Sequence, residues 1–138
     1  MGRLVIWLSF LGILFFVEAK FIRHIFLDIS KERIIKQTEP LIKAIDQYQM
    51  DFGVYPRQLE SLIPQYIENL SSLPGDYNTY KDLDSTYQLS FRQWVGGRTY
   101  RVVVYNPTET FVVPEYATSF DVPSFHDTDL EKWKYFDY

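Results

Sequence analysis

Few residues in this chain have the type and spacing that catalysis or metal binding requires. The 138 residues include two histidines, His24 and His126, and no cysteine. A zinc site needs several clustered His, Cys or carboxylate ligands, and a catalytic triad needs a histidine beside its nucleophile. Neither histidine lies in such a pattern, so we predict that neither is functional. The lack of cysteine also excludes disulfides and thiolate ligands, although it assigns no compartment.

Carboxylates gather in two places, and neither group resembles a calcium-binding loop. Such a loop alternates its oxygen ligands around a glycine, and both groups lack that order, so we interpret them as solvated. The chain also has no glycine-rich phosphate loop and no Gly-x-Ser-x-Gly motif. We therefore predict a protein that is not an enzyme and has no cofactor, metal or small-molecule substrate. The two groups are Asp82 with Asp84, and Asp121 with Asp127, Asp129 and Glu131.

Composition also limits the classes of molecule that this chain is expected to bind. The formal net charge is −4 and no long basic run is present, so a nucleic-acid-binding surface is not expected. Aromatic residues are unusually many, with 11 Tyr, 11 Phe and 3 Trp. Such side chains support a small core, and they also form surfaces that bind glycan, lipid or peptide. Most of them follow the alternating patterns described below, which favours packing.

The N-terminal segment has the composition of a membrane helix. Residues 4–17 are apolar apart from Ser9 and Gly12. As a helix they span about 21 Å, which is less than the hydrocarbon core of about 30 Å. Continuation through Ala19, Phe21 and Ile22 gives about 19 residues and nearly spans the bilayer, and we expect the helix to continue to about Phe26. We therefore predict a transmembrane anchor helix at residues 1–27.

Two alternatives for this segment stay open. A basic start, an apolar stretch and the sequence Val17-Glu18-Ala19 also fit a secretory signal peptide that is cleaved near Ala19. A buried helix is apolar on every face as well. Continuity favours the anchor, because residues 18–52 contain no glycine and one proline. The helical pattern therefore does not stop where a leader would be cut.

The next segment predicts an amphipathic helix that opens a folded domain of residues 28–138. Apolar positions recur at spacings of three and four, which places them on one helix face. Pro40 predicts a kink or a fresh helix start with Thr38 as its N-cap. Gly53 suits a left-handed C-terminal cap. The face comprises Ile34, Thr38, Leu41, Ile42, Ile45, Tyr48 and Phe52, and we expect its last two aromatic rings to lie on the buried side.

Prolines mark the turns that follow. Tyr55-Pro56 predicts an extended turn, because the residue before a proline avoids helical backbone angles. Residues 59–63 then predict one or two turns of helix that Pro64 ends. Asn106-Pro107 predicts a second turn.

Strands complete the domain, so the predicted fold class is α+β, with a long N-terminal helix packed on a small antiparallel meander. Alternation predicts half-buried strands at about 86–94 and 98–105. Gly96-Gly97 predicts the two-residue hairpin turn between them, since both central positions favour positive φ. Phe111–Val113 is expected to be a third strand that Pro114 limits. We expect an irregular, aromatic-rich tail to be held to the sheet or helix by Phe120, Phe125, Trp133, Tyr135 and Phe136.

One ordered set of residues is informative as a whole. A long helix ends in an aromatic, an acid and a glycine, and is followed by Tyr-Pro, a leucine-rich short helix and a proline-bracketed segment. In this order the stretch from Ala44 to Leu73 resembles the bacterial type II secretion pseudopilins, and more broadly the type IV pilin superfamily. Residues 77–80 and 87–91 resemble the first strand that follows in such proteins. The matching structural positions are Tyr48, Asp51, Gly53, Tyr55, Pro56, Leu59, Leu62 and Pro64.

The N-terminus departs from the standard pilin pattern. Pilin-like precursors carry a Gly-Phe junction before the apolar helix and a glutamate near its start. Here neither is present, and Glu18 lies at the far end. The calcium loop of the major pseudopilins is also not recognisable, because the Gly96-Gly97 turn lacks flanking acids. The resemblance therefore implies neither processing by prepilin peptidase nor polymerisation.

The resemblance implies a membrane-anchored structural or assembly protein of a bacterial secretion or pilus-type system. Its implied partners are membrane lipid and either helices of other proteins or further copies of itself. It also implies a single-pass protein of the inner (plasma) membrane with an extracytoplasmic domain. The positive-inside rule alone would favour a cytoplasmic domain, because Lys20, Arg23, Lys31 and Arg33 follow the apolar run. The alternative function is a membrane-tethered binding module with an aromatic-rich surface for glycan, lipid or peptide.

Overall fold

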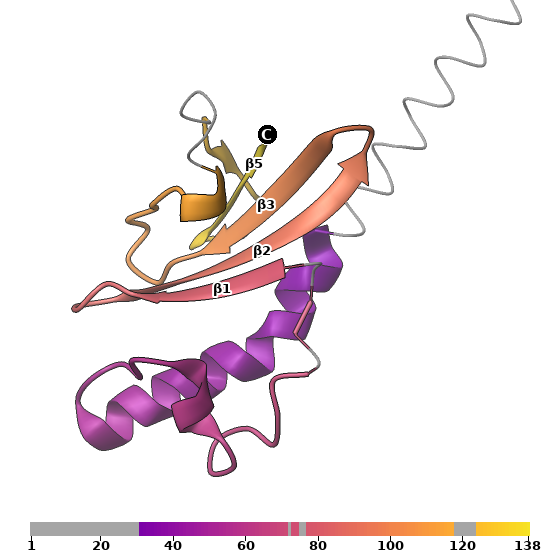
Figure 1. Ribbon diagram of the computed structural model, residues 1–138. Helices are drawn as coiled ribbons and strands as arrows, with labels where there is room; N and C mark the ends of the chain where they lie inside the picture. Colours follow the sequence, from indigo (N-terminus) through magenta and orange to yellow (C-terminus); the bar gives the residue numbers. More distant parts are fainter. Residues whose placement is uncertain (1–30, 72, 75–76, 118–123) are drawn as a thin grey trace, which may run out of the picture. The chain divides into compact units, whose positions relative to one another are not determined.

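The computed structural model describes residues 31–71, 73–74, 77–117 and 124–138. The chain divides into two units, Met1–Glu32 and Arg33–Tyr138, and the second contains the sheet. A helix of residues 31–52 precedes a five-stranded antiparallel sheet, which confirms the α+β class (Figure 1). The predicted anchor and the cleavage site near Ala19 lie outside the described residues. Within the described ranges, no helix is long and apolar enough to cross a bilayer.

The 31–52 helix buries the stripe that its periodicity predicts. Ile34, Leu41 and Ile45 are buried, and the same face also buries Ile35 and Ala44. The expectation for Phe52 was wrong. Its side chain is 57% exposed, because the ring lies against Tyr48, 4.6 Å between centroids, instead of entering the core.

The helix continues through Pro40, so the predicted fresh start and the predicted N-cap at Thr38 were wrong. Thr38 is buried inside the helix, and its hydroxyl donates to the carbonyl oxygen of Ile34 at 2.7 Å. A proline removes the N–H that would bond the carbonyl four residues earlier, here that of Lys36. Both the Lys36 and the Pro40 side chains are exposed. Water can therefore hydrate that carbonyl, which makes the proline tolerable.

The helix ends as predicted. Gly53 has a φ of +74°, and its N–H donates to the carbonyl oxygen of Gln49 at 2.8 Å. This is the bond of a left-handed C-terminal cap. The short helix that follows is a 3₁₀ helix, η1, at Leu59–Leu62, and both of its leucines are buried.

The sheet is larger than the predicted meander. Its order is β1-β2-β3-β5-β4, and all neighbouring pairs are antiparallel. β2 and β3 correspond to the two predicted strands, whereas Phe111–Val113 forms no strand. The strands are β1 (Tyr77–Asp82), β2 (Tyr87–Gly96), β3 (Thr99–Tyr105), β4 (His126–Asp127) and β5 (Trp133–Asp137), and a second 3₁₀ helix, η2, covers Glu115–Ala117.

The hairpin between β2 and β3 turns one residue later than predicted. Trp94 pairs with Tyr100 and Gly96 pairs with Thr99, so Val95 is an extra residue on β2. This bulge moves the turn, and residues 97–98 rather than 96–97 occupy its centre.

The C-terminal tail is not irregular, contrary to expectation, because it supplies β4 and β5. β5 pairs with β3 along five residues, from Tyr105 opposite Trp133 to Arg101 opposite Asp137. Trp133 packs in the cluster on the helix side, and Phe136 packs in the cluster on the other side. A strand with apolar side chains on both faces has no alternating pattern. Periodicity in the sequence therefore does not predict β5.

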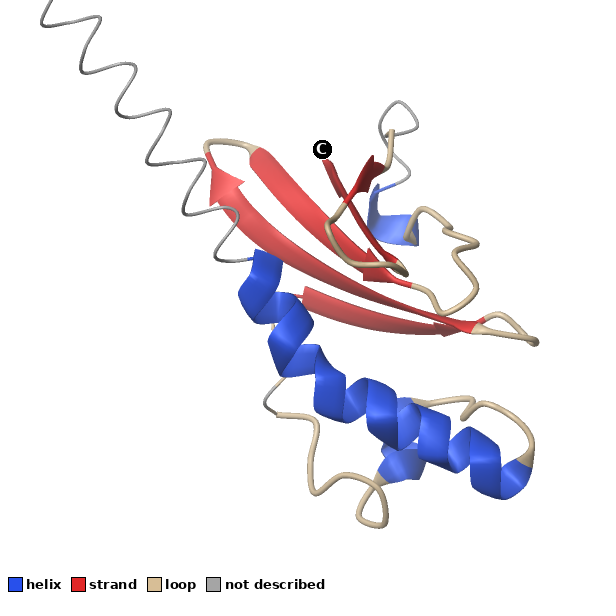
Figure 2. Ribbon diagram, turned by 180° about the vertical axis from the view of Figure 1, so that it is seen from behind, coloured by secondary structure: helices blue, strands red, loops and turns tan. Residues whose placement is uncertain are grey.

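Both faces of the central strands are covered (Figure 2). The helix and η1 pack on one face, and the segment around Phe111 and η2 packs on the other. The prediction of half-buried strands was therefore wrong, since Gln88 and Ser90 are also buried. Gln88 explains why residues 111–113 form no strand. Its amide donates to the Val112 carbonyl oxygen at 2.7 Å and accepts from the Val112 N–H at 2.8 Å.

The predicted turn at Asn106-Pro107 is confirmed and is built on a fully buried asparagine. The Asn106 amide donates to the Thr110 carbonyl oxygen at 2.8 Å, and its side-chain oxygen accepts from the Thr108 N–H at 2.8 Å. Its backbone N–H donates to the Lys132 carbonyl oxygen at 3.0 Å. One side chain thus shapes the start of the segment that covers the second face.

Replacement of Gly53 by Val should destabilise the folded domain by about 1 kcal/mol or more. A Cβ at this position meets no atom within 4 Å, so the cost comes from the positive φ rather than from a clash. Denaturant unfolding of the full chain in detergent measures the effect. Gly53→Asn is the matched control, because Asn adopts left-handed angles more readily and should lose less. Equal stability of Gly53→Val and the wild type would contradict the cap.

Gln88→Leu should cost about 1–3 kcal/mol, because it leaves the N–H and the carbonyl of Val112 without their partner. We also expect faster hydrogen exchange of the Val112 amide, measured by NMR. Gln47→Leu is the control, since Gln47 is exposed and makes a single 3.0 Å bond to Asp51. Unchanged exchange at Val112 in the Gln88 variant would show that other contacts hold the segment.

Candidate functional site

The motif positions that suggested a family gather where the helix ends and meets the sheet. Tyr48 lies between two rings, with centroids 4.6 Å from Phe52 and 5.6 Å from Tyr66. The Tyr66 hydroxyl donates to the Asp51 carboxylate at 2.7 Å, and Gln47 donates to the same carboxylate. The aromatic and the acid at the helix end therefore bind the segment after η1 back onto the helix.

Tyr55 and Pro56 form the second half of this junction. The Tyr55 ring lies 5.0 Å from the ring of Tyr87, which is on β2. Pro56 is buried, and its carbonyl oxygen accepts a hydrogen bond from the Tyr80 hydroxyl on β1. The Tyr-Pro turn thus connects the helix end to two strands.

The remaining motif positions differ in burial. Leu59 and Leu62 enter the core beneath the helix. Pro64 follows a cis peptide bond and is exposed. The junction accordingly unites most of the motif positions, and Pro64 is at its margin.

A tyrosine cluster fills the contact between helix and sheet. Tyr87 is fully buried, and its ring also contacts Tyr80 and Tyr105, each at 5.9 Å. Its hydroxyl donates to the Asp46 carboxylate on the helix at 3.4 Å. The sequence does not mark Asp46, Tyr66, Tyr80 and Tyr87 as a group, because their separations along the chain follow no periodic pattern.

Burial governs the acid–base behaviour of this cluster. It raises the pKa of Tyr87 above the ordinary 10.0, and the neighbouring Tyr105 and Asp46 act in the same direction. Burial also raises the pKa of Tyr80. The pKa of Asp46 is raised above 3.8 by burial, against the opposing effects of the Tyr87 hydrogen bond and the charge of Lys132.

Because the pKa values of these tyrosines are raised in the folded state, the junction should lose stability at alkaline pH. A phenol whose pKa is higher in the folded state holds its proton more tightly there. Its contribution to stability is fully present below pH 10.0 and is lost as the pH rises through the folded-state pKa. The pKa of Asp46 is also higher in the folded state, so its contribution to folding stability is fully present below pH 3.8. That contribution is lost as the pH rises through the raised folded-state pKa.

A hollow of about 640 Å³ opens beside the junction. Tyr48 and Tyr55 form part of its wall, together with Arg57 and the two aspartates of the β1–β2 turn, Asp82 and Asp84. The Asp82 carboxylate accepts a bond from the backbone N–H of Asp84 at 3.1 Å, so it shapes its own turn. Within the described part of the chain, no cluster of three or more His or carboxylate side chains could hold a metal ion.

The chain matches no family model, no curated protein and no solved structure. The pilin-like resemblance therefore depends on the order of residues in the sequence alone.

The other residues considered for chemistry are apart from this junction. The His126 ring lies 5.3 Å from the Tyr135 ring, and Asp127 forms an ion pair with Lys134 at 3.3 Å. Asp129 and Glu131 are exposed. His24, Phe120 and Asp121 lie outside the described residues.

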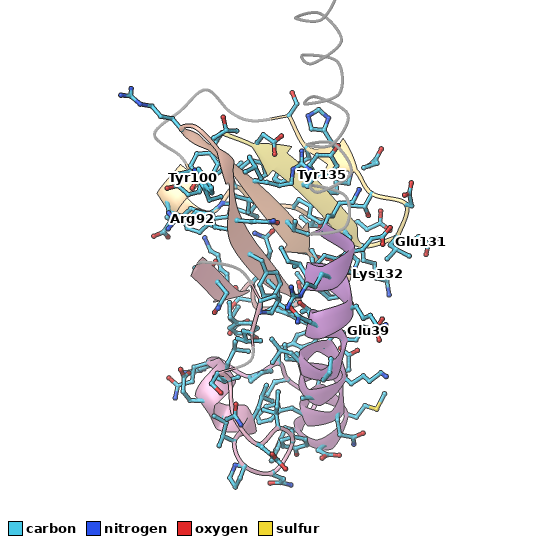
Figure 3. All side chains as sticks on the ribbon, turned by 90° about the vertical axis from the view of Figure 1, so that its right-hand side faces the viewer. Glu39, Arg92, Tyr100, Glu131, Lys132 and Tyr135 are labelled. Atoms are coloured by element: carbon cyan, nitrogen blue, oxygen red, sulfur yellow. The ribbon has the colours of Figure 1, made fainter. Side chains whose placement is uncertain are left out.

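The aromatic residues serve mainly as packing. Trp133 is buried against Tyr105 and Phe91. On the side away from the helix, Figure 3 shows Arg92 beside Tyr100, and the guanidinium carbon lies 4.9 Å from that ring. Trp94, by contrast, is 56% exposed.

The Tyr66–Asp51 bond predicts a measurable titration. The hydrogen bond to Asp51 and, less strongly, burial raise the pKa of Tyr66 to about 12. Asp51→Asn removes the charge and keeps an acceptor oxygen, so the pKa of Tyr66 should fall toward 10.0. Carbon-13 NMR of labelled tyrosine rings measures the pKa, with Tyr66→Phe assigning the signal.

Asp127→Asn removes a carboxylate of β4 and should leave the pKa of Tyr66 unchanged. The same pKa of Tyr66 in the Asp51→Asn variant and the wild type would contradict the charged Asp51 carboxylate as the cause of the shift.

Proposed function

We propose that this chain is a membrane-anchored, pseudopilin-like structural or assembly protein of a secretion or pilus-type system. Its apolar N-terminal segment would hold it in the inner membrane, with the folded domain on the extracytoplasmic side. The observation that carries the proposal is the junction at the end of the 31–52 helix. There Tyr48, Asp51 and Tyr55 tie the helix to the segments that follow it.

The use of polar groups supports a structural role. Asp46 accepts from Tyr87, Asp51 accepts from Tyr66, and Asp137 binds Arg101 through two bonds of 2.7 and 2.9 Å. These carboxylates stabilise the contacts between elements. Each of these carboxylates therefore has a structural partner within the fold.

The polarity of the helix indicates where partner helices would bind. Beyond its buried stripe, the 31–52 helix exposes Lys36, Glu39, Lys43 and Gln47. A polar face of this kind is suited to water rather than to close packing with another helix. We therefore assign helix–helix contacts, with other proteins or with further copies, to the apolar segment that precedes residue 31.

The alternative, a membrane-tethered binding module, draws support from the hollow beside the junction. Its tyrosine rings, Arg57 and aspartates are groups that bind glycans. The burial of Trp133 counts against a broad aromatic surface. We favour the assembly role, because Tyr48 and Tyr55 are already packed against other rings.

Cysteine cross-linking in membranes tests the assembly role, since the native chain contains no cysteine. Single substitutions along the apolar segment, such as Phe10→Cys, Ile13→Cys and Leu14→Cys, should give cross-linked products from one helix face. Lys43→Cys on the exposed face of the described helix is the control and should give none.

The same approach tests sidedness. Tyr138→Cys should react with a membrane-impermeant maleimide added to intact spheroplasts if the domain is extracytoplasmic. A monodisperse monomer without cross-links at any position, or protection of residue 138 until lysis, would refute the assembly role or the assigned side, respectively.

A further inference from the structure

β1 is an edge of the sheet. It pairs with β2 along six residues, and the sheet order gives it no second neighbour among the described strands (Figure 1). The opposite edge, β4, has two residues. β1 is therefore the longer of the two open edges.

The register shows which backbone groups of β1 face away from the sheet. The Leu83 N–H donates to the Thr86 carbonyl oxygen at 2.9 Å, which makes this a hydrogen-bonded pair of the antiparallel ladder. Such pairs alternate, so Lys81 also bonds toward β2, and the intervening residues direct their N–H and C=O groups outward. The outward set is Asn78, Tyr80 and Asp82, and none of the described residues is hydrogen-bonded to these backbone groups.

A hollow lies on each face of the sheet beside this edge. On the helix side, a hollow of about 400 Å³ has Leu59, Leu70 and Leu73 in its wall. On the other side, a hollow of about 420 Å³ has Gln88 and Ser90 in its wall. One hollow is thus partly aliphatic. In the other, Gln88 and Ser90 are buried, and the more accessible lining residues include Thr79 and Tyr116.

We propose that the β1 edge binds an extended peptide segment of a partner protein, which adds a strand to the sheet. Backbone bonds to Asn78, Tyr80 and Asp82 would hold the segment, and its side chains would enter the two hollows in alternation. The segment therefore carries aliphatic residues at every second position, toward the leucines. Small side chains such as those of Ser and Thr occupy the positions between, toward Thr79 and Tyr116.

Charge and shape favour this partner. Each hollow contains one cation and one carboxylate, Arg57 with Glu60 and Lys81 with Glu115, so neither attracts a strongly charged segment. The walls come from η1, Leu70 and Leu73 on one side and from residues 114–116 on the other. Because these segments flank β1 on both sides, a single extended strand can reach its edge more easily than the sheet edge of a second folded copy can. This proposal is independent of the membrane anchor.

Amide NMR of the full chain in detergent tests the proposal with a synthetic capped hexapeptide, Thr-Val-Ser-Val-Thr-Val. We expect saturable shifts at the amides of Asn78, Tyr80 and Asp82. A peptide with the same side chains and alternate N-methylated amides should bind at least tenfold more weakly. A peptide of the same composition with the three valines in a block should also bind at least tenfold more weakly.

A matched pair of variants tests the protein side. Asn78→Pro removes one outward N–H and keeps the ladder, because proline is tolerated at such an edge position. It should weaken binding at least tenfold, whereas Asn78→Thr keeps the N–H and should bind as the wild type does. Absent saturation, equal binding of the two peptides that differ in N-methylation, or shifts confined to Met50–Val54 would overturn the proposal. Concentration-dependent shifts of the same amides without peptide would assign the edge to a second copy instead.

Discussion

Tyr87 occupies the position on which the contact between helix and sheet depends. Its ring touches the Tyr-Pro turn through Tyr55, the edge strand through Tyr80 and the neighbouring strand through Tyr105, while its hydroxyl reaches Asp46 on the helix. A single buried side chain thus contacts the helix, the Tyr-Pro turn, β1 and β3. Large aromatic rings bury much apolar area and keep a polar group for a directed bond. The position of the helix on the sheet is therefore set by a packed ring cluster with few polar bonds.

Coverage of both sheet faces has consequences beyond the core. The segment over the second face has no strand to pair with, so its backbone is satisfied by side chains, at Val112 by Gln88 and at Thr108 and Thr110 by Asn106. Buried backbone groups need such partners. This cover reaches β2 and β3 and leaves a hollow beside β1. The covered centre and the hollow beside β1 thus involve the same segment.

These features connect structure with the proposed role. An assembly subunit must keep its domain in a defined position on its helix, and the Tyr48–Asp51–Tyr66 and Tyr55–Tyr87 contacts supply that connection. Asp46, Asp51 and Asp137 accept hydrogen bonds that join different elements. The proposed binding surface is the β1 edge, whose outward backbone groups the core does not use.

Local signals in the sequence determined the α+β class, the helix with its glycine cap, the short helix before Pro64 and the two long strands, because each depends on periodicity or on backbone angles of single residues. The tertiary structure decided the rest. β5 has no alternation because both its faces are buried, Pro40 is tolerated because its helix face meets water, and Val112 bonds to a side chain 24 residues away. The junction joins residues 41 positions apart. Such contacts depend on which surfaces meet in the folded protein, and a local sequence pattern does not specify those surfaces.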